Sequence, residues 1–235
     1  MKKRNITLLT AIAAAAALAP AAQAVTIAHT GFEEPASGVS SFTPSGSDTE
    51  IGFSVPDGGN FSVSTAGVIT GTKSFRMKTS VGLQQNDGYS DPLTDLGTSV
   101  TFGTVDLSGF SGVDFSVDIN VIISGYEHTG GDGGEAYRVF LDLFDGTSTT
   151  TVTVFDSWVS IGDLDGVDDG PTLPYTYDVP DNTVSATASV FWNSTSASEG
   201  MDIDNLSFIG TAIPEPTSMS LLALSGLVML RRRRA

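Results

Sequence analysis

Val113-Asp-Phe-Ser-Val-Asp-Ile-Asn-Val121 decides the fold, because its nine residues are apolar at every odd position and polar at every even one. Strict period two is typical of a β-strand with one buried and one solvated face, as antiparallel sheets contain. The same alternation recurs in Tyr137–Phe144, Thr151–Phe155, Thr183–Trp192 and Met201–Ile209. These five segments together predict an antiparallel β protein.

Shorter apolar runs fill the rest of the chain between the two ends. They predict further strands over Val25–Thr30, Ile51–Val55, Asn60–Ser64, Gly67–Thr70 and Ser74–Ser80, separated by turns rich in Gly, Pro, Ser and Asp. No stretch shows sustained helical periodicity. About ten to twelve short strands of this kind form a two-sheet sandwich. We therefore predict one all-β domain over residues 25–212.

The predicted domain is strongly acidic and contains no cysteine. Four basic residues face 26 acidic ones between Val25 and Ile213, which gives a formal charge of −22. Binding to nucleic acid or anionic lipid requires basic patches, so the composition argues against both. The charge suits an extracellular protein that binds divalent cations or stays soluble by self-repulsion. Without disulfides, packing or a bound metal must supply the stability.

The first 24 residues have the pattern of a secretory signal peptide. Lys2, Lys3 and Arg4 precede an apolar run over Ile6–Leu18, and Ala22-Gln-Ala24 is an A-x-A cleavage site. Signal peptidase is thus expected to cut after Ala24 and leave Val25 as the first mature residue. An uncleaved membrane anchor is the alternative, but the apolar run is short and ends in small residues.

The last 23 residues, 213–235, contain three different pieces in a fixed order. Pro214, Glu215 and Pro216 predict an extended spacer, because each proline disfavours helix in the residue before it. The apolar run over Met219–Leu230 predicts a hydrophobic helix in lipid. Four arginines follow and anchor its cytoplasmic end, namely Arg231, Arg232, Arg233 and Arg234.

This arrangement resembles the PEP-CTERM sorting signal of exported Gram-negative bacterial proteins. The resemblance implies that an exosortase recognises the Pro-Glu-Pro motif, cuts nearby and passes the protein from the inner membrane to the cell surface or extracellular matrix. The alternative is a plain C-terminal membrane anchor in which the Pro-Glu-Pro motif is coincidental.

Three short motifs at the two ends and within the body suggest a second resemblance. They are Gly31-Phe-Glu33, Gly71-Thr-Lys-Ser-Phe-Arg-Met77 and Asp202-Ile-Asp-Asn-Leu206. In this order they resemble jelly-roll carbohydrate-binding modules and other galactose-binding-like domains. The resemblance implies a structural calcium ion held by Glu33 and Asp204, with backbone oxygens near Lys73. The alternative places Glu33 in solvent, and Asp202 and Asp204 on a wet strand face.

One feature of the last motif departs from simple alternation. Leu206 shares the face of Asp202 and Asp204 in period two, which predicts either a bulge or a partly buried aspartate. A second acidic cluster contains Asp163, Asp165 and Asp168, with the spacing of a calcium loop. It lacks the closing glutamate of an EF-hand, so a solvated acidic hairpin is the favoured interpretation.

Catalytic motifs are scarce in the sequence. Thiol chemistry is excluded because the chain has no cysteine, and only His29 and His128 are available as histidines. G-x-S-x-G and Walker-type loops do not occur in the body. A glycoside hydrolase with paired carboxylates is an alternative, but no pair stands out among the many acids. We expect a protein that is not an enzyme.

Aromatic residues that can stack on sugar rings are present. Tyr126, Trp158, Tyr175 and Tyr177 are the candidate ligand-binding residues, and Trp192 beside Phe191 is expected in the core. Two hypotheses follow. In the first, the sandwich binds polysaccharide with calcium support. In the second, it is a structural acidic matrix protein without a specific ligand.

Overall fold

The protein is described by a computed structural model. The described residues are 23–35, 39, 41–44, 49–54, 61–65, 68–78, 98–122, 136–157, 173–193 and 200–213. Both predicted terminal helices, the sorting motif, Ala22, Tyr126, Trp158 and the acidic cluster over 163–168 lie outside them. No helix within these ranges is long and apolar enough to cross a membrane.

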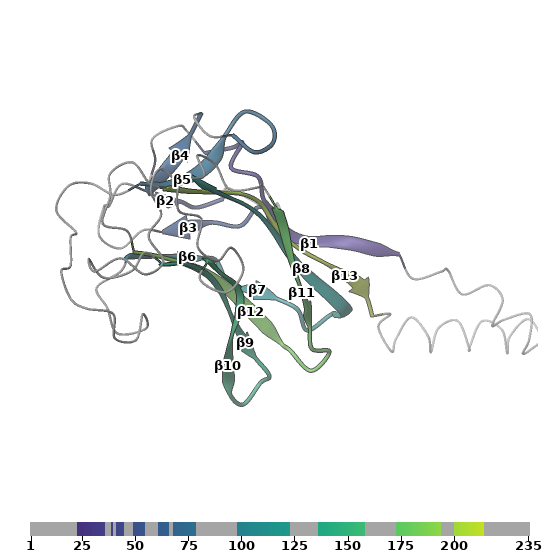
Figure 1. Ribbon diagram of the computed structural model, residues 1–235. Coiled ribbons are helices and arrows are strands. Elements are labelled where there is room, and N and C mark those ends of the chain that lie inside the picture. The colour runs from purple at the N-terminus through teal and green to yellow at the C-terminus, as the bar shows by residue number, and fades with distance from the viewer. Residues whose placement is uncertain are drawn as a thin grey trace, which may run out of the picture.

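The described residues form two antiparallel sheets, which confirms the predicted all-β jelly-roll sandwich (Figure 1). The first sheet has the order β11-β8-β13-β5-β4, with β1 also paired to β13. Its strands are β1 (Ala24–Thr30), β4 (Phe61–Ser64), β5 (Ser74–Lys78), β8 (Phe110–Ile122), β11 (Leu173–Val179) and β13 (Gly200–Ala212).

The second sheet has the order β10-β9-β12-β6-β3-β2, with β7 also paired to β12. Its strands are β2 (Ser41–Phe42), β3 (Phe53–Ser54), β6 (Thr98–Phe102), β7 (Val105–Asp106), β9 (Ala136–Phe144), β10 (Thr149–Asp156) and β12 (Ser185–Asn193). Each of the five alternating segments of the sequence is a strand here, and β8 extends the predicted Val113–Val121 at both ends.

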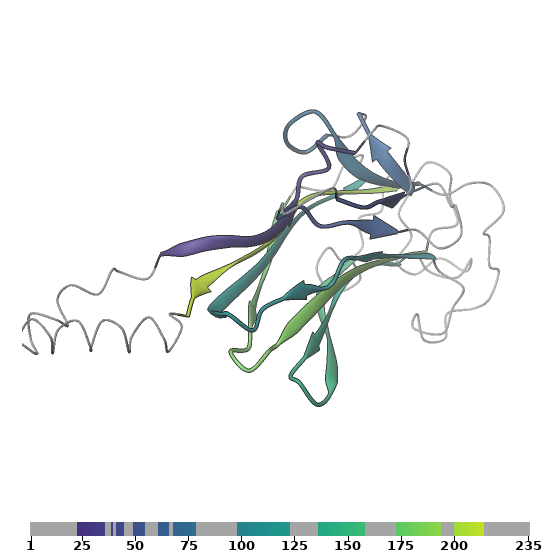
Figure 2. The same cartoon turned by 180° about the vertical axis from the view of Figure 1, so that it is seen from behind.

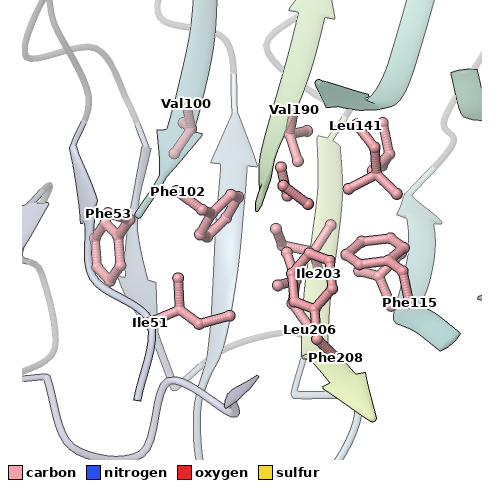
Figure 3. Packing of buried hydrophobic residues seen from close by; sticks show 14 of the residues in the cluster. Ile51, Phe53, Val100, Phe102, Phe115, Leu141, Val190, Ile203, Leu206 and Phe208 are labelled. Atoms are coloured by element: carbon pink, nitrogen blue, oxygen red, sulfur yellow. The ribbon is translucent and has the colours of Figure 1, made fainter. Parts of the chain in front are cut away.

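The core lies between the sheets and is built from their inward-facing apolar residues (Figure 3). Phe115 and Phe208 from neighbouring strands of the first sheet pack with ring centroids 5.0 Å apart. A second group of rings joins the sheets: Phe75 of β5 lies 5.0 Å from Phe53 of β3. Each such fully buried ring stabilises the fold by roughly 1.5–3 kcal/mol relative to exposure. The core therefore fixes the outward direction of the alternate residues on every strand.

The first and last strands are neighbours. β1 pairs with β13 from Ala24 opposite Thr211 to Thr30 opposite Leu206. Figures 1 and 2 show the start of β1 and the end of β13 leaving the sandwich on the same side. Both ends of the body thus lie together at one end of the first sheet.

One predicted strand is wrong. Within Gly67–Thr70, the described residues 68–70 form no strand and lead instead into the turn before β5. The amide and hydroxyl of Thr70 bind a side chain of β13, so this backbone is not available to a sheet ladder.

Candidate functional site

β13 changes its neighbour part-way along its length. Residues Gly200–Ile203 pair with β5, whereas Leu206–Thr211 pair with β1. Between them the register with β8 shifts after Asp204, and Asn205 has a positive φ of 48°. This is a β-bulge, in which an extra residue re-aims the side chains around it. It confirms the bulge that the position of Leu206 predicted.

Two turns meet this bulge because β1 ends and β5 begins beside it. Residues Gly31–Glu33 leave β1, and residues Thr70–Lys73 lead into β5. We call these two turns, together with Asp204 and Asn205, the β13 junction. Phe32 anchors the first turn: it is fully buried, and its ring centroid lies 5.5 Å from that of Phe75. The buried ring leaves Glu33 to point at the second turn.

Glu33 caps the turn before β5. Its Oε1 accepts hydrogen bonds from the amides of Thr72 (2.7 Å) and Lys73 (3.0 Å), and its Oε2 accepts one from the Thr72 hydroxyl (2.5 Å). These bonds, chiefly those from Thr72, lower the pKa of Glu33. The Lys73 ammonium donates back to the carbonyl oxygens of Glu33 (2.5 Å) and Pro35 (2.7 Å). The exposed glutamate and the turn therefore fix each other.

Asp204 caps the opposite side of the same turn. Its Oδ2 accepts hydrogen bonds from the amide (2.9 Å) and hydroxyl (2.8 Å) of Thr70, and its Oδ1 accepts one from the amide of Asn205 (2.8 Å). Asn205 Nδ2 also donates to Asp118 (2.7 Å) on β8. Burial raises the pKa of Asp204, and the nearby charge of Asp118 adds to this effect.

The two aspartates of the last motif have different electrostatic partners. Arg76 binds Asp202 with two hydrogen bonds, from Nε (2.7 Å) and from Nη2 (2.8 Å). For Asp204, the described residues provide hydrogen-bond donors but no ion pair. Both aspartates are fully buried, so the alternative that placed them on a wet strand face is wrong. Asp204 is thus a buried carboxylate without a described cation.

The donor set of the junction is compatible with calcium. A carboxylate can accept about four hydrogen bonds or equivalent contacts. Glu33 receives three from the turn before β5, and Asp204 receives two from Thr70 of that turn and one from the amide of Asn205, which leaves one position on Glu33 Oε2 and one on Asp204 Oδ1. Within the described ranges no three His, Asp or Glu side chains group as metal ligands. Any calcium here would need backbone, hydroxyl or water oxygens for the rest of its six to eight ligands.

A second candidate region is the outer face of the second sheet. Successive residues of a strand point to opposite faces, so the neighbours of buried Val139, Leu141 and Val190 point outward. One outward row crosses six strands in register and carries five hydroxyls and one phenyl ring. From edge to edge it is Thr153, Phe140, Ser189, Thr101, Ser54 and Ser41.

The rows on either side are also polar and aromatic. One contains Asp156, Arg138, Phe191 and Ser99, in which Arg138 Nε lies 2.8 Å from Asp156 Oδ2. The other contains Thr151, Asp142 and Thr187, in which the Thr151 hydroxyl donates to Asp142 (2.5 Å). We call these three rows the hydroxyl face. It offers hydroxyl, carboxylate and phenyl groups on one side of a sheet, whereas the Arg138 guanidinium is buried against Asp156.

Comparison with known proteins finds likeness only at the level of solved structures. No family description matches the chain, and no curated protein matches its sequence. The xylan-binding CBM22-1 domain of Xyn10C from Paenibacillus barcinonensis is 12% identical with a TM-score of 0.41, over 83% of this chain and 99% of that one. The K3 cleaved adhesin domain of Lys-gingipain from Porphyromonas gingivalis is 8% identical with a TM-score of 0.44, over 80% and 99%.

A third similar structure is the C-terminal family 22 carbohydrate-binding module of Clostridium thermocellum Xyn10B. It is 11% identical with a TM-score of 0.44, over 80% of this chain and 94% of that one. These structural neighbours are carbohydrate-binding and adhesin domains. At such identities, no residue of the β13 junction or the hydroxyl face is assigned by the likeness.

The two tyrosines predicted to bind ligand lie elsewhere. Tyr175 and Tyr177 share one face of β11, pair with Val117 and Phe115, and pack half-buried against the core. The Tyr175 ring lies 4.6 Å from Phe155 of the second sheet, and burial raises its pKa. They close one edge of the sandwich and do not form an exposed pair.

Sequence reasoning missed the residues of the hydroxyl face. Alternation in Tyr137–Phe144 places Phe140 and Asp142 on one side of a strand, but it does not say which strands lie beside it. The strand β6, which contributes Thr101, was not predicted at all. The signal that could have identified the face is the presence of Ser and Thr at outward-facing alternate positions in several strands.

Proposed function

We propose that this chain is an exported, non-catalytic protein whose hydroxyl face binds an extended polysaccharide. The observation that carries the proposal is the row from Thr153 to Ser41, which crosses six strands in register. Neighbouring strands lie about 4.8 Å apart, a spacing similar to the length of one pyranose unit. Successive sugars along the row would each meet a hydroxyl or a ring.

The chemistry of the face fits a neutral glycan. Phe140 and Phe191 present apolar rings to the apolar side of a pyranose, and the Ser and Thr hydroxyls both donate and accept hydrogen bonds. Asp142 adds a charged partner for sugar hydroxyls, while Arg138 is buried against Asp156. The −22 charge of the body would repel an acidic polysaccharide, so we infer a neutral one.

The proposed role of calcium is structural. Bound at the β13 junction by Glu33 and Asp204, the ion would supply the positive charge that Asp204 lacks among its described contacts. It would also join the end of β1 to the last strand and hold the turn before β5 between them. Support comes from the buried Asp204 carboxylate and from the open acceptor position on each acid.

A non-catalytic role is inferred from the way the acids of the face are used. Asp156 is paired with Arg138, and Asp142 accepts a hydrogen bond from Thr151. Both carboxylates are held by fixed neighbours on the protein, whereas a glycosidase needs a pair of carboxyl groups that flank the scissile bond of the substrate. The alternative of a structural matrix protein assigns no role to the in-register row.

Export and surface display complete the proposal. Strand β1 begins at Ala24 and β13 ends at Ala212, so the sandwich nearly coincides with the residues between the proposed signal peptide and the proposed sorting signal. Cleavage after Ala24 would remove only the first residue of β1, and exosortase cleavage near the Pro-Glu-Pro motif would leave β13 whole. The product would be an acidic sandwich at the cell surface or in the extracellular matrix.

An array of neutral plant and bacterial polysaccharides tests the function. The full chain, purified in detergent, is applied with calcium and again with a chelator. Binding to a neutral linear glycan in calcium is expected, with weaker binding in chelator. A chain that is folded by circular dichroism but binds no glycan in either buffer would contradict the proposal and favour a structural matrix role.

A further inference from the structure

Exposed apolar residues gather where both ends of the body leave the sandwich. Val25 is 40% exposed, Ile209 is 39% exposed and Ile213 is 51% exposed. Thr26 lies opposite Ile209, and the Ile213 amide donates to the carbonyl of Gly109 at 2.8 Å. These three residues, which we call the terminal patch, are a majority of the five exposed large apolar residues in the described ranges.

The patch surrounds the end of the sheet and does not cover one of its faces. Val25 pairs with Gly210 and Ile209 pairs with Thr26, so Val25 and Ile209 point to opposite sides. Two residues further along β1, Ile27 lines a cavity of about 450 Å³ between the sheets, together with Val105 and Phe110. A partner that meets the strand ends would contact all three residues.

The chain beyond the patch indicates what this partner is. The predicted hydrophobic run Met219–Leu230 begins six residues after Ile213, and the run Ile6–Leu18 ends six residues before Ala24. Six extended residues span at most about 20 Å. While either segment sits in a bilayer, the terminal patch is therefore held within about 20 Å of it.

Charge around this end favours an uncharged surface. Asp106, Asp114 and Asp181 are exposed there, and Asp178 lies directly opposite Asp114 in the sheet. All four basic residues of the body lie at or beyond the β13 junction: Lys73, Arg76, Lys78 and Arg138. Anionic lipid would repel this end, whereas zwitterionic lipid would allow the apolar contact.

We propose that the terminal patch rests on the bilayer surface in the membrane-held precursor, so that the strands point away from the membrane. This rests on the proposed anchoring by the C-terminal helix. The strand ends that carry Lys78 and Arg138 then lie farthest from the lipid. The hydroxyl face then runs roughly parallel to the membrane normal, so polysaccharide can reach it before the C-terminal segment is cleaved.

Lipid-dependent quenching of single labels tests the orientation. The chain has no cysteine, so Ile209→Cys, Ser108→Cys and Ser99→Cys each introduce one site for a fluorophore. Ile209 and Ser108 lie at the terminal end, and Ser108 also serves if Ile209→Cys folds poorly. Ser99 lies at the far end of the second sheet, opposite Phe191, and is the matched control. The full chains are reconstituted in phosphatidylcholine vesicles that contain a headgroup-linked quencher.

Quenching at positions 209 and 108 is expected to exceed that at 99 by at least about threefold, and phosphatidylglycerol should reduce the difference. Vesicle-bound chains with equal quenching at all three positions would overturn the orientation and leave the anchoring intact. Chains that do not associate with vesicles would overturn the anchoring itself, and the orientation with it.

Discussion

Thr70 holds the carboxylate of Asp204 with both its amide and its hydroxyl, although 134 residues separate the two along the chain. This double contact joins the turn before β5 to the bulge of the last strand. Glu33 holds the other side of the same turn. The β13 junction is therefore built from three distant parts of the sequence, and its stability depends on a few hydrogen bonds to carboxylates.

Replacing Thr70 by Val removes the hydroxyl and keeps the shape of the side chain. Hydrogen bonds to charged groups contribute about 1.5–3 kcal/mol, and the retained amide bond limits the loss, so we expect a decrease of about 1–2 kcal/mol in the free energy of unfolding. Urea denaturation measures it. Thr176→Val, at an exposed position of β11, is the matched control and should change the value by less than about 0.5 kcal/mol.

Gly71 should not tolerate a side chain. Its φ is +66°, and a β-carbon there would lie 2.2 Å from Glu33 Oε1. Gly71→Ala is expected to cost about 1–3 kcal/mol from backbone strain and to displace the Glu33 carboxylate. Gly109→Ala is the control, because a β-carbon at Gly109 meets nothing within 4 Å. Equal denaturation midpoints for the two variants would contradict the close contact.

The pH dependence of stability should identify the uncompensated charge. Burial raises the pKa of folded Asp204 above its unfolded value, so its contribution is fully present at low pH and is lost as pH rises through the folded pKa. In chelator, Asp204→Asn should therefore gain stability relative to the wild type between pH 3 and pH 7. Calcium should reverse this gain, because the ion stabilises the ionised carboxylate. A difference between the two proteins that calcium does not alter would count against the metal site.

Arg76 and Asp202 should be strongly coupled. Asp202 is fully buried, and hydrogen bonding to it raises the pKa of Arg76. Arg76→Met leaves a buried carboxylate without its cation, which we expect to cost about 3 kcal/mol in thermal or chemical unfolding. The double variant Arg76→Met with Asp202→Asn should be less destabilised than Arg76→Met alone. Additive costs of the two single changes would show that the pair is not coupled.

Phe140 is the central aromatic residue of the proposed glycan surface. Phe140→Ala should weaken binding to a glycan found on the array about tenfold, or ~1.4 kcal/mol, measured by isothermal titration. Ser116→Ala, on the outer side of the first sheet, should leave the affinity unchanged. Loss of binding in Tyr177→Phe with normal binding in Phe140→Ala would move the site to the β11 edge.

The sequence predicted the sheets better than the surfaces. Alternation in Val113–Val121 identified β8 because a strand with one buried face must repeat every two residues. The position of Leu206 identified the bulge for the same reason. The motifs also brought Glu33 and Asp204 to one turn, but the intervening role of Thr70 was missed and its segment was predicted as a strand. A side chain that caps another residue 134 positions away has no local pattern.

Long-range pairing also explains why the surroundings of Tyr175 and Tyr177 could not be predicted. The alternation that contains Tyr175 and Tyr177 is the same whether the two side chains are exposed or face the core. Only the register of β11 with β8 and the contact of Tyr175 with Phe155 show that they face the core. The hydroxyl face was missed for a related reason. Its Ser and Thr residues form a continuous row only when six strands are paired side by side.

The pairing of the first strand with the last has a consequence for delivery. When the chain crosses a narrow channel with its N-terminus first, β1 emerges first and β13 last. In the described sheet β1 pairs only with β13, so it cannot form its strand pairing until almost the whole body has emerged. Such long-range closure slows folding and keeps apolar strands open in the meantime. Electrostatic repulsion among the 26 acidic residues would then reduce aggregation, because it keeps incompletely folded chains apart until β1 and β13 can pair.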